Sequence, residues 1–308
     1  MTAFLLLTAL AVAPMLCASQ DPVTCSVDRF PDAAKMAVRH INEQQDHGYK
    51  FRLMETKSSR MELADGGCTI QLQLDLGETE CSFISTKPAE DCEYRGKASW
   101  AVAANCTVLL SVKGADAKVA KYGCSMRKEP ASAEEMMLIC PDCPKLLLLS
   151  DEAGIRGVLA GVSQFNQNTS NQHLYGLQDV GRISLGYVMT MGMMYYSEFV
   201  LKETNCPRGT RIVPEACDAL CTDRAHHAFC HLSYATRDNQ VLSLSCEVFP
   251  PKNFTPLGPG EQEPSCPSPR RSAGSGYVFA CPGAEPNADP TMHPVCPYPV
   301  PEVLQVQS

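Results

Sequence analysis

The 308-residue chain lacks the sequence patterns of common hydrolases and of nucleic-acid-binding proteins. It contains neither the His-Glu-x-x-His pattern of zinc proteases nor the Gly-x-Ser-x-Gly pattern of serine hydrolases. Clusters of lysine and arginine are absent, and the net charge of −8 disfavours contact with nucleic acid. We therefore expect a protein that is not an enzyme, that needs no cofactor or resident metal ion, and that does not bind nucleic acid.

Long apolar runs are also missing from the chain. Phe4 to Val12 is a short apolar segment, and Cys17 and Ser19 supply small side chains at the −3 and −1 positions of a cleavage site. This pattern predicts a secretory signal over residues 1–19. No later run approaches the roughly 18 apolar residues that a membrane span requires. We expect a secreted, extracellular protein that makes no membrane contact.

Cysteine, by contrast, is abundant, and its spacing reveals an internal repeat. Without Cys17 in the predicted signal, sixteen of the seventeen cysteines remain, an even number suited to disulfides in an oxidising compartment. Eight of them form two series whose corresponding members are 125, 125, 124 and 122 positions apart. Because Val38, Ile41 and Asn42 recur as Val162, Phe165 and Asn166 at an offset of 124, we infer a duplicated domain. The two series are Cys81, Cys92, Cys106 and Cys124, and Cys206, Cys217, Cys230 and Cys246.

Each copy is predicted to contain one amphipathic helix followed by antiparallel strands. Ser150 is the expected N-cap of the second helix. The segment from Ile70 to Leu76 alternates apolar and polar residues, as a half-buried strand does. The fold class is therefore α+β, with a helix across a sheet in residues 20–139 and again in residues 145–250. The apolar helix positions are Ala34, Ala37, Val38 and Ile41 in the first copy, and Ile155, Val158, Leu159, Val162 and Phe165 in the second.

The simplest disulfide scheme pairs near neighbours in the same way in both copies. Cys68 and Cys221 have no counterpart in the other copy, so they are left to pair with each other or with the tail. Residues 251–308 are rich in Pro, Gly and Ser, which predicts a flexible tail held by disulfide rather than by a core of its own. The expected pairs are Cys81–Cys92, Cys106–Cys124, Cys206–Cys217 and Cys230–Cys246.

The linker Cys140-Pro141-Asp142-Cys143-Pro144 lies between the two copies. A Cys-x-x-Cys pattern is typical of a metal-ligand pair or a redox dithiol, but two prolines and the absence of a βαβ context disfavour the redox role. Each proline fixes its own φ and biases the preceding residue toward extended conformations. If the two sulfurs are bridged, Asp142 is held outward on a small rigid ring. The plain structural alternative is a linker disulfide with a solvated aspartate.

A signal, two helix-on-sheet domains with paired cysteines, and a Pro-rich tail resemble the fetuin branch of the cystatin superfamily. The linker at 140–144 is most similar to that of the fetuin-B group. The resemblance implies two tandem cystatin-like domains and inhibition of astacin-type zinc metalloproteinases, with Asp142 binding the catalytic zinc of the target. It also implies a disulfide from Cys25 to Cys266, Cys281 or Cys296 in the tail.

The resemblance further implies that two hairpins of the second domain flank the linker in the target's cleft. The stretch from Val188 to Gly192 matches the Gln-x-Val-x-Gly hairpin of cystatins but lacks the glutamine and the valine, so inhibition of papain-like proteases is not expected. The methionines of this hairpin would form a flexible apolar tip, although core packing is the usual role of such a stretch. The predicted hairpin residues are Met189, Thr190, Met191, Gly192, Met193 and Met194 in the first, and Arg237, Asp238 and Asn239 in the second.

Three other interpretations stay open. The first is a fetuin-A-like carrier of calcium phosphate, for which Asp75, Glu78 and Glu80 are the outward carboxylates. The second is an antihaemorrhagic inhibitor of venom metalloproteases, which fits the architecture only. The third is a zinc site in the stretch from Cys217 to His231, disfavoured because two of its cysteines already fit the repeated pairs. The stretch contains Cys217, Cys221, His226, His227, Cys230 and His231.

Three Asn-x-Ser/Thr patterns predict glycan sites on a secreted chain. They begin at Asn105, Asn168 and Asn253, and the first abuts Cys106. We expect the mature protein to be a monomeric glycoprotein.

Overall fold

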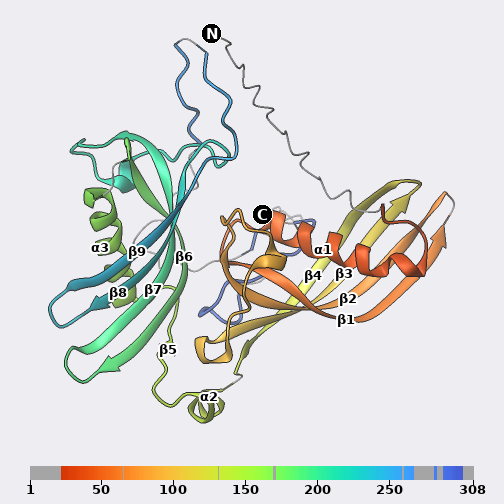
Figure 1. The fold of residues 1–308 in the computed structure, drawn as a ribbon, viewed down its shortest axis with the longest axis horizontal. Coiled ribbons are helices and arrows are strands. Elements are labelled where there is room, and N and C mark those ends of the chain that lie inside the picture. The colour runs from red at the N-terminus through yellow and green to blue at the C-terminus, as the bar shows by residue number, and fades with distance from the viewer. Residues whose placement is uncertain are drawn as a thin grey trace, which may run out of the picture.

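Two α+β domains lie side by side in the computed structural model, connected by the linker (Figure 1). The structure describes residues 22–64, 66–130, 132–168, 171–258, 260–266, 281–282 and 287–300. The predicted signal over residues 1–19 lies outside them. Among the described residues, no helix combines the length and the apolar character needed to cross a membrane.

The first domain places one helix across a four-stranded antiparallel sheet with the strand order β1-β2-β3-β4. Along β2 the residues Ile70, Leu72, Leu74 and Leu76 are fully buried against the helix and its neighbours, which confirms the predicted alternating strand. The elements are η1 (Val27–Arg29), α1 (Phe30–Gln44), β1 (Tyr49–Ala64), β2 (Gly67–Ser82), η2 (Ala89–Asp91), η3 (Lys97–Ser99), β3 (Ala101–Lys113) and β4 (Asp116–Glu129).

The second domain repeats this plan, and the short strand β5 adds to the edge of its sheet, giving the order β5-β6-β7-β8-β9. The helix α2 (Ala133–Ile139) stands between the two domains. The other elements are β5 (Lys145–Leu146), α3 (Glu152–Asn168), β6 (His173–Val188), β7 (Gly192–Pro207), η4 (Pro214–Ala216), β8 (His227–Ala235) and β9 (Gln240–Phe249). The predicted fold class, two helix-on-sheet domains of one plan, is confirmed.

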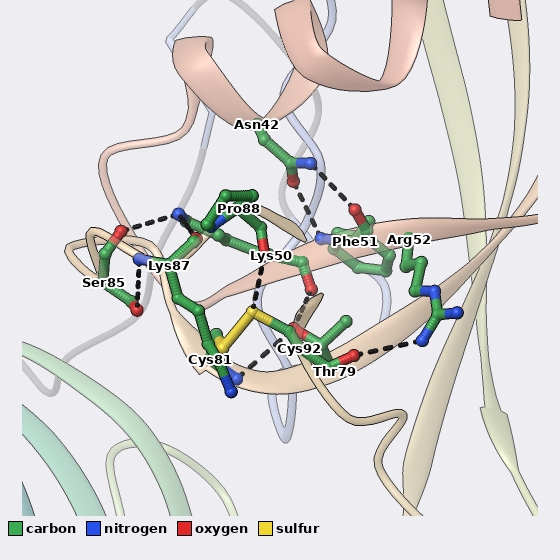
Figure 2. Close-up of a disulfide and its surroundings, with 10 residues drawn as sticks. All are labelled: Asn42, Lys50, Phe51, Arg52, Thr79, Cys81, Ser85, Lys87, Pro88 and Cys92. Carbon is green, nitrogen blue, oxygen red and sulfur yellow. Dashed lines mark hydrogen bonds between the residues drawn. A yellow bond between two sulfur atoms is a disulfide. The ribbon is translucent and has the colours of Figure 1, made fainter. Parts of the chain in front are cut away.

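The repeat extends to individual hydrogen bonds. Figure 2 shows that Asn42 of α1 makes two hydrogen bonds with the backbone of Phe51 in β1. Its Nδ2 donates to Phe51 O and its Oδ1 accepts from Phe51 N, both at 2.8 Å. In the second domain Asn166 makes the same pair of bonds to Tyr175, at 2.9 and 2.8 Å. These bonds satisfy backbone groups where the chain leaves the helix for the sheet, which explains why asparagine occupies both positions.

The second helix begins one residue later than expected. Asp151, not Ser150, provides the cap, because Asp151 Oδ1 accepts a hydrogen bond from Gly154 N at 2.9 Å. A side-chain oxygen of aspartate can accept this backbone hydrogen bond just as the hydroxyl of serine can. The negative charge of aspartate also interacts favourably with the positive N-terminal end of the helix dipole.

The described residues contain eight disulfides. They include the four repeated pairs and Cys140–Cys143. The tail disulfide expected at Cys25 is wrong: Cys25 is bonded to Cys68, which ties the segment before α1 to the start of β2. Cys221 is bonded to Cys266, and Cys281 to Cys296. The expectation for Cys68 is therefore wrong, since it pairs neither with Cys221 nor with the tail, whereas Cys221 does pair with the tail as one of the two alternatives had it.

Part of the tail differs from the prediction of a flexible segment held by disulfide alone. Met292 and Val295 are buried in the core of the first domain, and Tyr298 pairs with Tyr122 of β4 through two backbone hydrogen bonds of 2.8 and 3.0 Å. His293 Nε2 donates to Val180 O of the second domain at 2.8 Å. Although the tail has few aliphatic residues, these few occupy a site that the first domain leaves open, so residues 287–300 lie against both domains.

A buried group of charges joins the two domains. Glu78 of β2 accepts from Arg182 Nη2 of β6 at 2.6 Å, and Arg95 donates to both carboxylate oxygens of Glu198 of β7, at 3.2 and 2.9 Å. Tyr49 donates its hydroxyl to the same Glu198 at 2.6 Å. Because each carboxylate meets an arginine from the other domain, the geometry of these ion pairs favours this relative placement of the two domains.

Candidate functional site

The linker forms a small closed ring that leads from α2 into β5. Cys140 and Cys143 are bonded to each other, and Cys143 N donates to Cys140 O at 3.3 Å. Pro141 and Asp142, at the turn between them, are exposed, whereas both cysteines are half-buried. The ring therefore presents one carboxylate to solvent on a backbone that the disulfide and the prolines restrict.

The first domain holds this ring through Trp100. The indole Nε1 of Trp100 donates to Pro144 O at 3.0 Å. The indole group also packs with Met136 of α2, Leu146 of β5 and the two cysteines of the linker. The carbonyls of Ser99 and Trp100 in turn accept from Arg182, at 3.1 and 3.0 Å. The linker is thus connected to the buried charges between the domains.

The second domain holds the other side of the linker by strand pairing. Lys145 and Leu146 pair with Leu185 and Ser184 of β6. One step further along, Pro144 lies against Gly186, where an added Cβ would sit 3.5 Å from the proline ring. Since β6 ends two residues after Gly186, the ring lies beside the turn that connects β6 to β7.

That turn contains the predicted methionine hairpin. Met189, Thr190 and Met191 connect β6 to β7, and Gly192 adopts the positive φ of 80° that the turn requires. The Met189 side chain is 91% exposed, which places it among the most exposed apolar side chains of the described residues. Met193 is half-exposed at 43%.

Met194 does not belong to this exposed tip. It is buried at 3% exposure, and it pairs with Ala235 of β8. Successive residues of a strand point to opposite faces, so Met193 and Met194 cannot both face solvent once one face is covered. Tyr187, which the sequence did not single out, is 69% exposed at the end of β6.

The second predicted hairpin turns at the same end of the sheet. Residues 236–239 connect β8 to β9, and Arg237, Asp238 and Asn239 are exposed. Asn239 has a φ of 50°, and its Oδ1 accepts from the Tyr234 hydroxyl at 2.9 Å, which fixes the turn. Because β7 pairs with both β6 and β8, the two turns and the linker ring lie along one end of the sheet, toward the lower left and bottom of Figure 1.

The stretch from Cys217 to His231 is not arranged as a metal site. Its three cysteines are all consumed in disulfides, and among the described residues no group of three or more His, Cys, Asp or Glu side chains could hold a metal ion. His226 and His173 instead bond through Nδ1 to Glu203, at 2.7 and 2.9 Å, beside a surface cavity of about 570 Å³.

Two of the predicted glycan sites can be described. Asn105 donates to Asp75 at 2.6 Å on the outer face of β3, and Asn253 donates to Asp223 at 3.3 Å after β9. Asn168 is the last residue of α3, and the rest of its pattern, residues 169–170, lies outside the described residues.

The sequence interpretation missed the residues that orient the linker. Trp100 is the single tryptophan of the chain and has a φ of 54°, an uncommon value for a bulky residue. The rarity of tryptophan could have drawn attention to it, but no local pattern connects it with a carbonyl 44 residues later. The exposed apolar end of α2 was also missed.

Comparisons with known proteins agree with this architecture. The family model described as cathelicidins matches residues 27–114 and 154–247, one segment in each domain. Antihemorrhagic factor cHLP-B of Gloydius brevicauda is 33% identical over 190 residues, covering 61% of this chain and 53% of that protein. Human fetuin-B is 27% identical over 223 residues, covering 70% of this chain and 56% of that protein. The chain spans somewhat more than half the length of these curated relatives.

Solved structures show the same fold. The crystal structure of mouse fetuin-B has a TM-score of 0.58 at 25% identity and covers 74% of this chain and 70% of that one. Mouse fetuin-B in complex with crayfish astacin scores 0.55 at 24% identity, covering 75% of this chain and 73% of that one. The inhibitory complex of human meprin beta with mouse fetuin-B scores 0.58 at 22% identity, covering 77% and 81%.

Fetuin-family proteins are non-enzymatic, and this chain is a non-enzymatic protein with paired cysteines in both of its repeated domains. It belongs to the family that the cathelicidin model describes, and it is a fetuin-family member of the cystatin superfamily.

Proposed function

We propose that this chain is a secreted, reversible inhibitor of astacin-type zinc metalloproteinases. In this proposal the linker of residues 140–144 enters the active-site cleft and Asp142 binds the catalytic zinc of the target. The observation that carries the proposal is the exposed Asp142 on a disulfide-closed ring, at the same end of the second domain as two hairpin turns. Fetuin-B relatives occur in crystal complexes with astacin and meprin beta, which supports this choice of target class.

The chemistry requires little more than the carboxylate. A catalytic zinc keeps one coordination position for water, and a carboxylate oxygen binds zinc at about 2.0–2.2 Å. Asp142 would displace this water and thereby remove the nucleophile. The disulfide restricts the linker before binding, so less conformational entropy is lost on insertion. The same restriction would keep the ring from adopting the extended geometry of a substrate.

The two hairpins would contact the cleft beside the entering ring, the β6–β7 turn next to it and the β8–β9 turn beyond. Met189 and Met191 can adapt to an apolar subsite because methionine is flexible and polarizable. The turn at Arg237, Asp238 and Asn239 supplies polar contacts. Since the first hairpin lacks the glutamine and valine of the cystatin pattern, we expect no inhibition of papain-like proteases.

The test is inhibition of a panel of astacin-type, other metzincin and papain-like proteases by wild type and by Asp142→Ala. The aspartate variant should lose most of its inhibition of the astacin-type enzymes. Asp116→Ala, which removes an exposed carboxylate at the start of β4, is the matched control and should inhibit like wild type. Equal inhibition by Asp142→Ala and wild type would refute the proposal.

A second variant tests the ring itself. Replacing Cys140 and Cys143 by Ser should weaken inhibition while the melting temperature changes little, because so short a loop contributes only about 2 kcal/mol or less to stability in the entropy model. A large fall in melting temperature would instead indicate that the disulfide has a structural role only.

The calcium phosphate carrier is not proposed, because its carboxylates are engaged. Glu78 is 6% exposed and faces Arg95 and Arg182 between the domains, which corrects its expected outward position. Asp75 lies 3.2 Å from Lys57 Nζ. This leaves Glu80 as the exposed carboxylate of the three, and a single carboxylate is too few for a mineral surface.

A further inference from the structure

The last turn of α2 is apolar on every side, although it is not enclosed. Successive residues of a helix point about 100° apart, so Met136, Met137, Leu138 and Ile139 together surround the helix axis. A helix that is apolar all round is normally buried. Here Met136 is 5% exposed, whereas Met137 is 64%, Leu138 89% and Ile139 43% exposed. We call these last three residues the α2 ridge.

The direction of the ridge is fixed by the contacts at its two ends. Ser132 Oγ accepts from Glu135 N at 3.2 Å and caps the start of the helix. Met136 is inserted beside Trp100 and Leu146, so the helix cannot rotate to hide the ridge without losing this contact. Cys140 N donates to Met136 O at 2.8 Å and continues the helix directly into the linker. The ridge is therefore presented on a fixed element, next to the ring that carries Asp142.

Charge is distributed so that the apolar end faces the linker. The acidic residues of α2, Glu134 and Glu135, are in its first turn, where their negative charges interact favourably with the positive end of the helix dipole. The ridge occupies the opposite end of the helix, nearest Cys140. On the other side of the ring, Tyr187, Met189 and Met191 form the exposed hairpin tip. Asp142 thus lies between two apolar surfaces, one that continues from the first domain and one that belongs to the second.

We propose that the α2 ridge is a docking surface for the target metalloproteinase. The ridge contacts an apolar rim of the proteinase's active-site cleft while the linker enters that cleft. This inference rests on the proposed function, and it adds a contact from the first-domain side to those of the two hairpins. Apolar anchors at the centre of an interface, surrounded by polar groups, carry much of the binding energy of protein complexes. The ridge ends at Ile139, three residues before Asp142 in the chain. An enzyme that reaches the Asp142 carboxylate therefore also comes close to the ridge.

The experiment measures inhibition constants against an astacin-type proteinase for Leu138→Ser and for Leu138→Met. Leu63→Ser is the matched control, because Leu63 is 78% exposed near the end of β1, opposite the end at which Tyr49 meets the second domain. Leu138→Ser should weaken inhibition about tenfold or more, whereas Leu138→Met and Leu63→Ser should stay within about twofold of wild type. The melting temperatures of all three variants should match wild type because both leucines are exposed.

Failure of this inference can be told apart from failure of the proposed function. If Asp142→Ala loses inhibition but Leu138→Ser inhibits like wild type, only the ridge is refuted. If the wild-type protein inhibits no member of the protease panel, the proposed function itself fails. Unchanged inhibition with a change in oligomeric state of Leu138→Ser on size-exclusion chromatography would assign the ridge to self-association, and loss of binding to neutral phosphatidylcholine vesicles would assign it to a lipid surface; either result overturns the inference.

Discussion

Glu78 and Glu203 occupy equivalent places in the two domains, 125 positions apart, but different side chains contact their carboxylates. Both are buried, at 6% and 7% exposure. In both, the carbonyl of the glutamate accepts a backbone hydrogen bond from the equivalent partner, Arg95 N at 3.0 Å and Leu220 N at 3.1 Å. Glu78 meets two arginines between the domains, whereas Glu203 meets two histidines beside an open cavity. The duplication has kept the backbone and changed the neighbours.

The same contrast holds for the segment that follows each domain. Trp100 donates to Pro144 O, in the linker after the first domain. Arg224, at an offset of 124, donates to Asn253 O and Thr255 O after the second domain, at 3.2 and 2.6 Å. One position thus holds the outgoing chain in both copies, but only in the first does that chain carry the proposed inhibitory carboxylate. A shared scaffold has acquired separate uses through single side chains.

The largest expected effect comes from breaking the buried charges between the domains. Arg182→Ala should lower the free energy of unfolding by about 3 kcal/mol or more, because Glu78 stays buried with one partner fewer. His173→Ala should cost about 1 kcal/mol or less, because Glu203 keeps His226 and borders the cavity. Denaturant titration of both variants measures the difference. Equal losses would show that the two glutamates are energetically alike after all.

The helices offer the next largest contrast. Ala33 and Gly157 are equivalent at an offset of 124, and an added Cβ at Gly157 would lie 2.9 Å from the Tyr234 ring. Gly157→Ala should therefore destabilise the protein by about 1–2 kcal/mol despite the better helix propensity of alanine, because overpacking outweighs it. Ala33→Gly, at a fully buried site, should cost about 1 kcal/mol by propensity. A gain of thermal stability in Gly157→Ala would contradict this account.

The contact between the domains should also depend on pH. Burial opposes ionisation of Glu198, but the charge and hydrogen bonds of Arg95 outweigh it and lower the pKa of Glu198 to about 2. A depressed pKa stabilises the fold at pH values above the unfolded value of about 4.5, and this stabilisation is lost as the pH falls toward 2. We expect a loss of about 1–2 kcal/mol between pH 6 and pH 3. Glu198→Gln, followed by thermal unfolding across this range, should remove that part of the pH dependence; an unchanged slope would exclude Glu198 as its source.

The smallest expected effect concerns the hold on the linker. Trp100→Phe keeps an aromatic ring but removes the N–H group that bonds Pro144 O, which should cost about 1 kcal/mol in stability. Under the proposed function, inhibition of an astacin-type enzyme should weaken a few-fold, since the ring is less well oriented. Phe229→Leu, an aromatic change between the domains and away from the linker, serves as the control for lost packing. If both variants weaken inhibition alike, orientation by the indole N–H is not involved.

Local patterns were reliable where they reflect local physics. The periodicity of Ala34, Ala37, Val38 and Ile41 identified a helix whose inner face is indeed buried, because helical geometry alone sets that spacing. Likewise the alternation that leads to Leu76 identified β2. Met194 was misassigned, since the change from an exposed turn to a paired strand depends on its partner Ala235 of β8, which lies 41 residues further along the chain.

Contacts between distant segments could not be read from the sequence. The bond between Cys25 and Cys68 joins two cysteines without counterparts in the repeat, so the repeat gave no information on them. The tail from residue 287 to 300 has too few apolar residues to predict a core contact, yet Met292 and Val295 fill a place in the first domain. Such contacts depend on the shape of a surface that exists after the domains have folded.

The sequence by itself determined the duplicated domain, the repeated cysteines and the short linker with its central aspartate, because spacing and residue type along the chain are sufficient for them. Tertiary structure decided how that linker is presented. Trp100 from one domain and β6 from the other hold it, and the exposed α2 ridge and the hairpin tip lie on its two sides. The reason is physical: hydrogen bonds and packing between segments tens of residues apart set the direction of a side chain, and no local pattern encodes that direction.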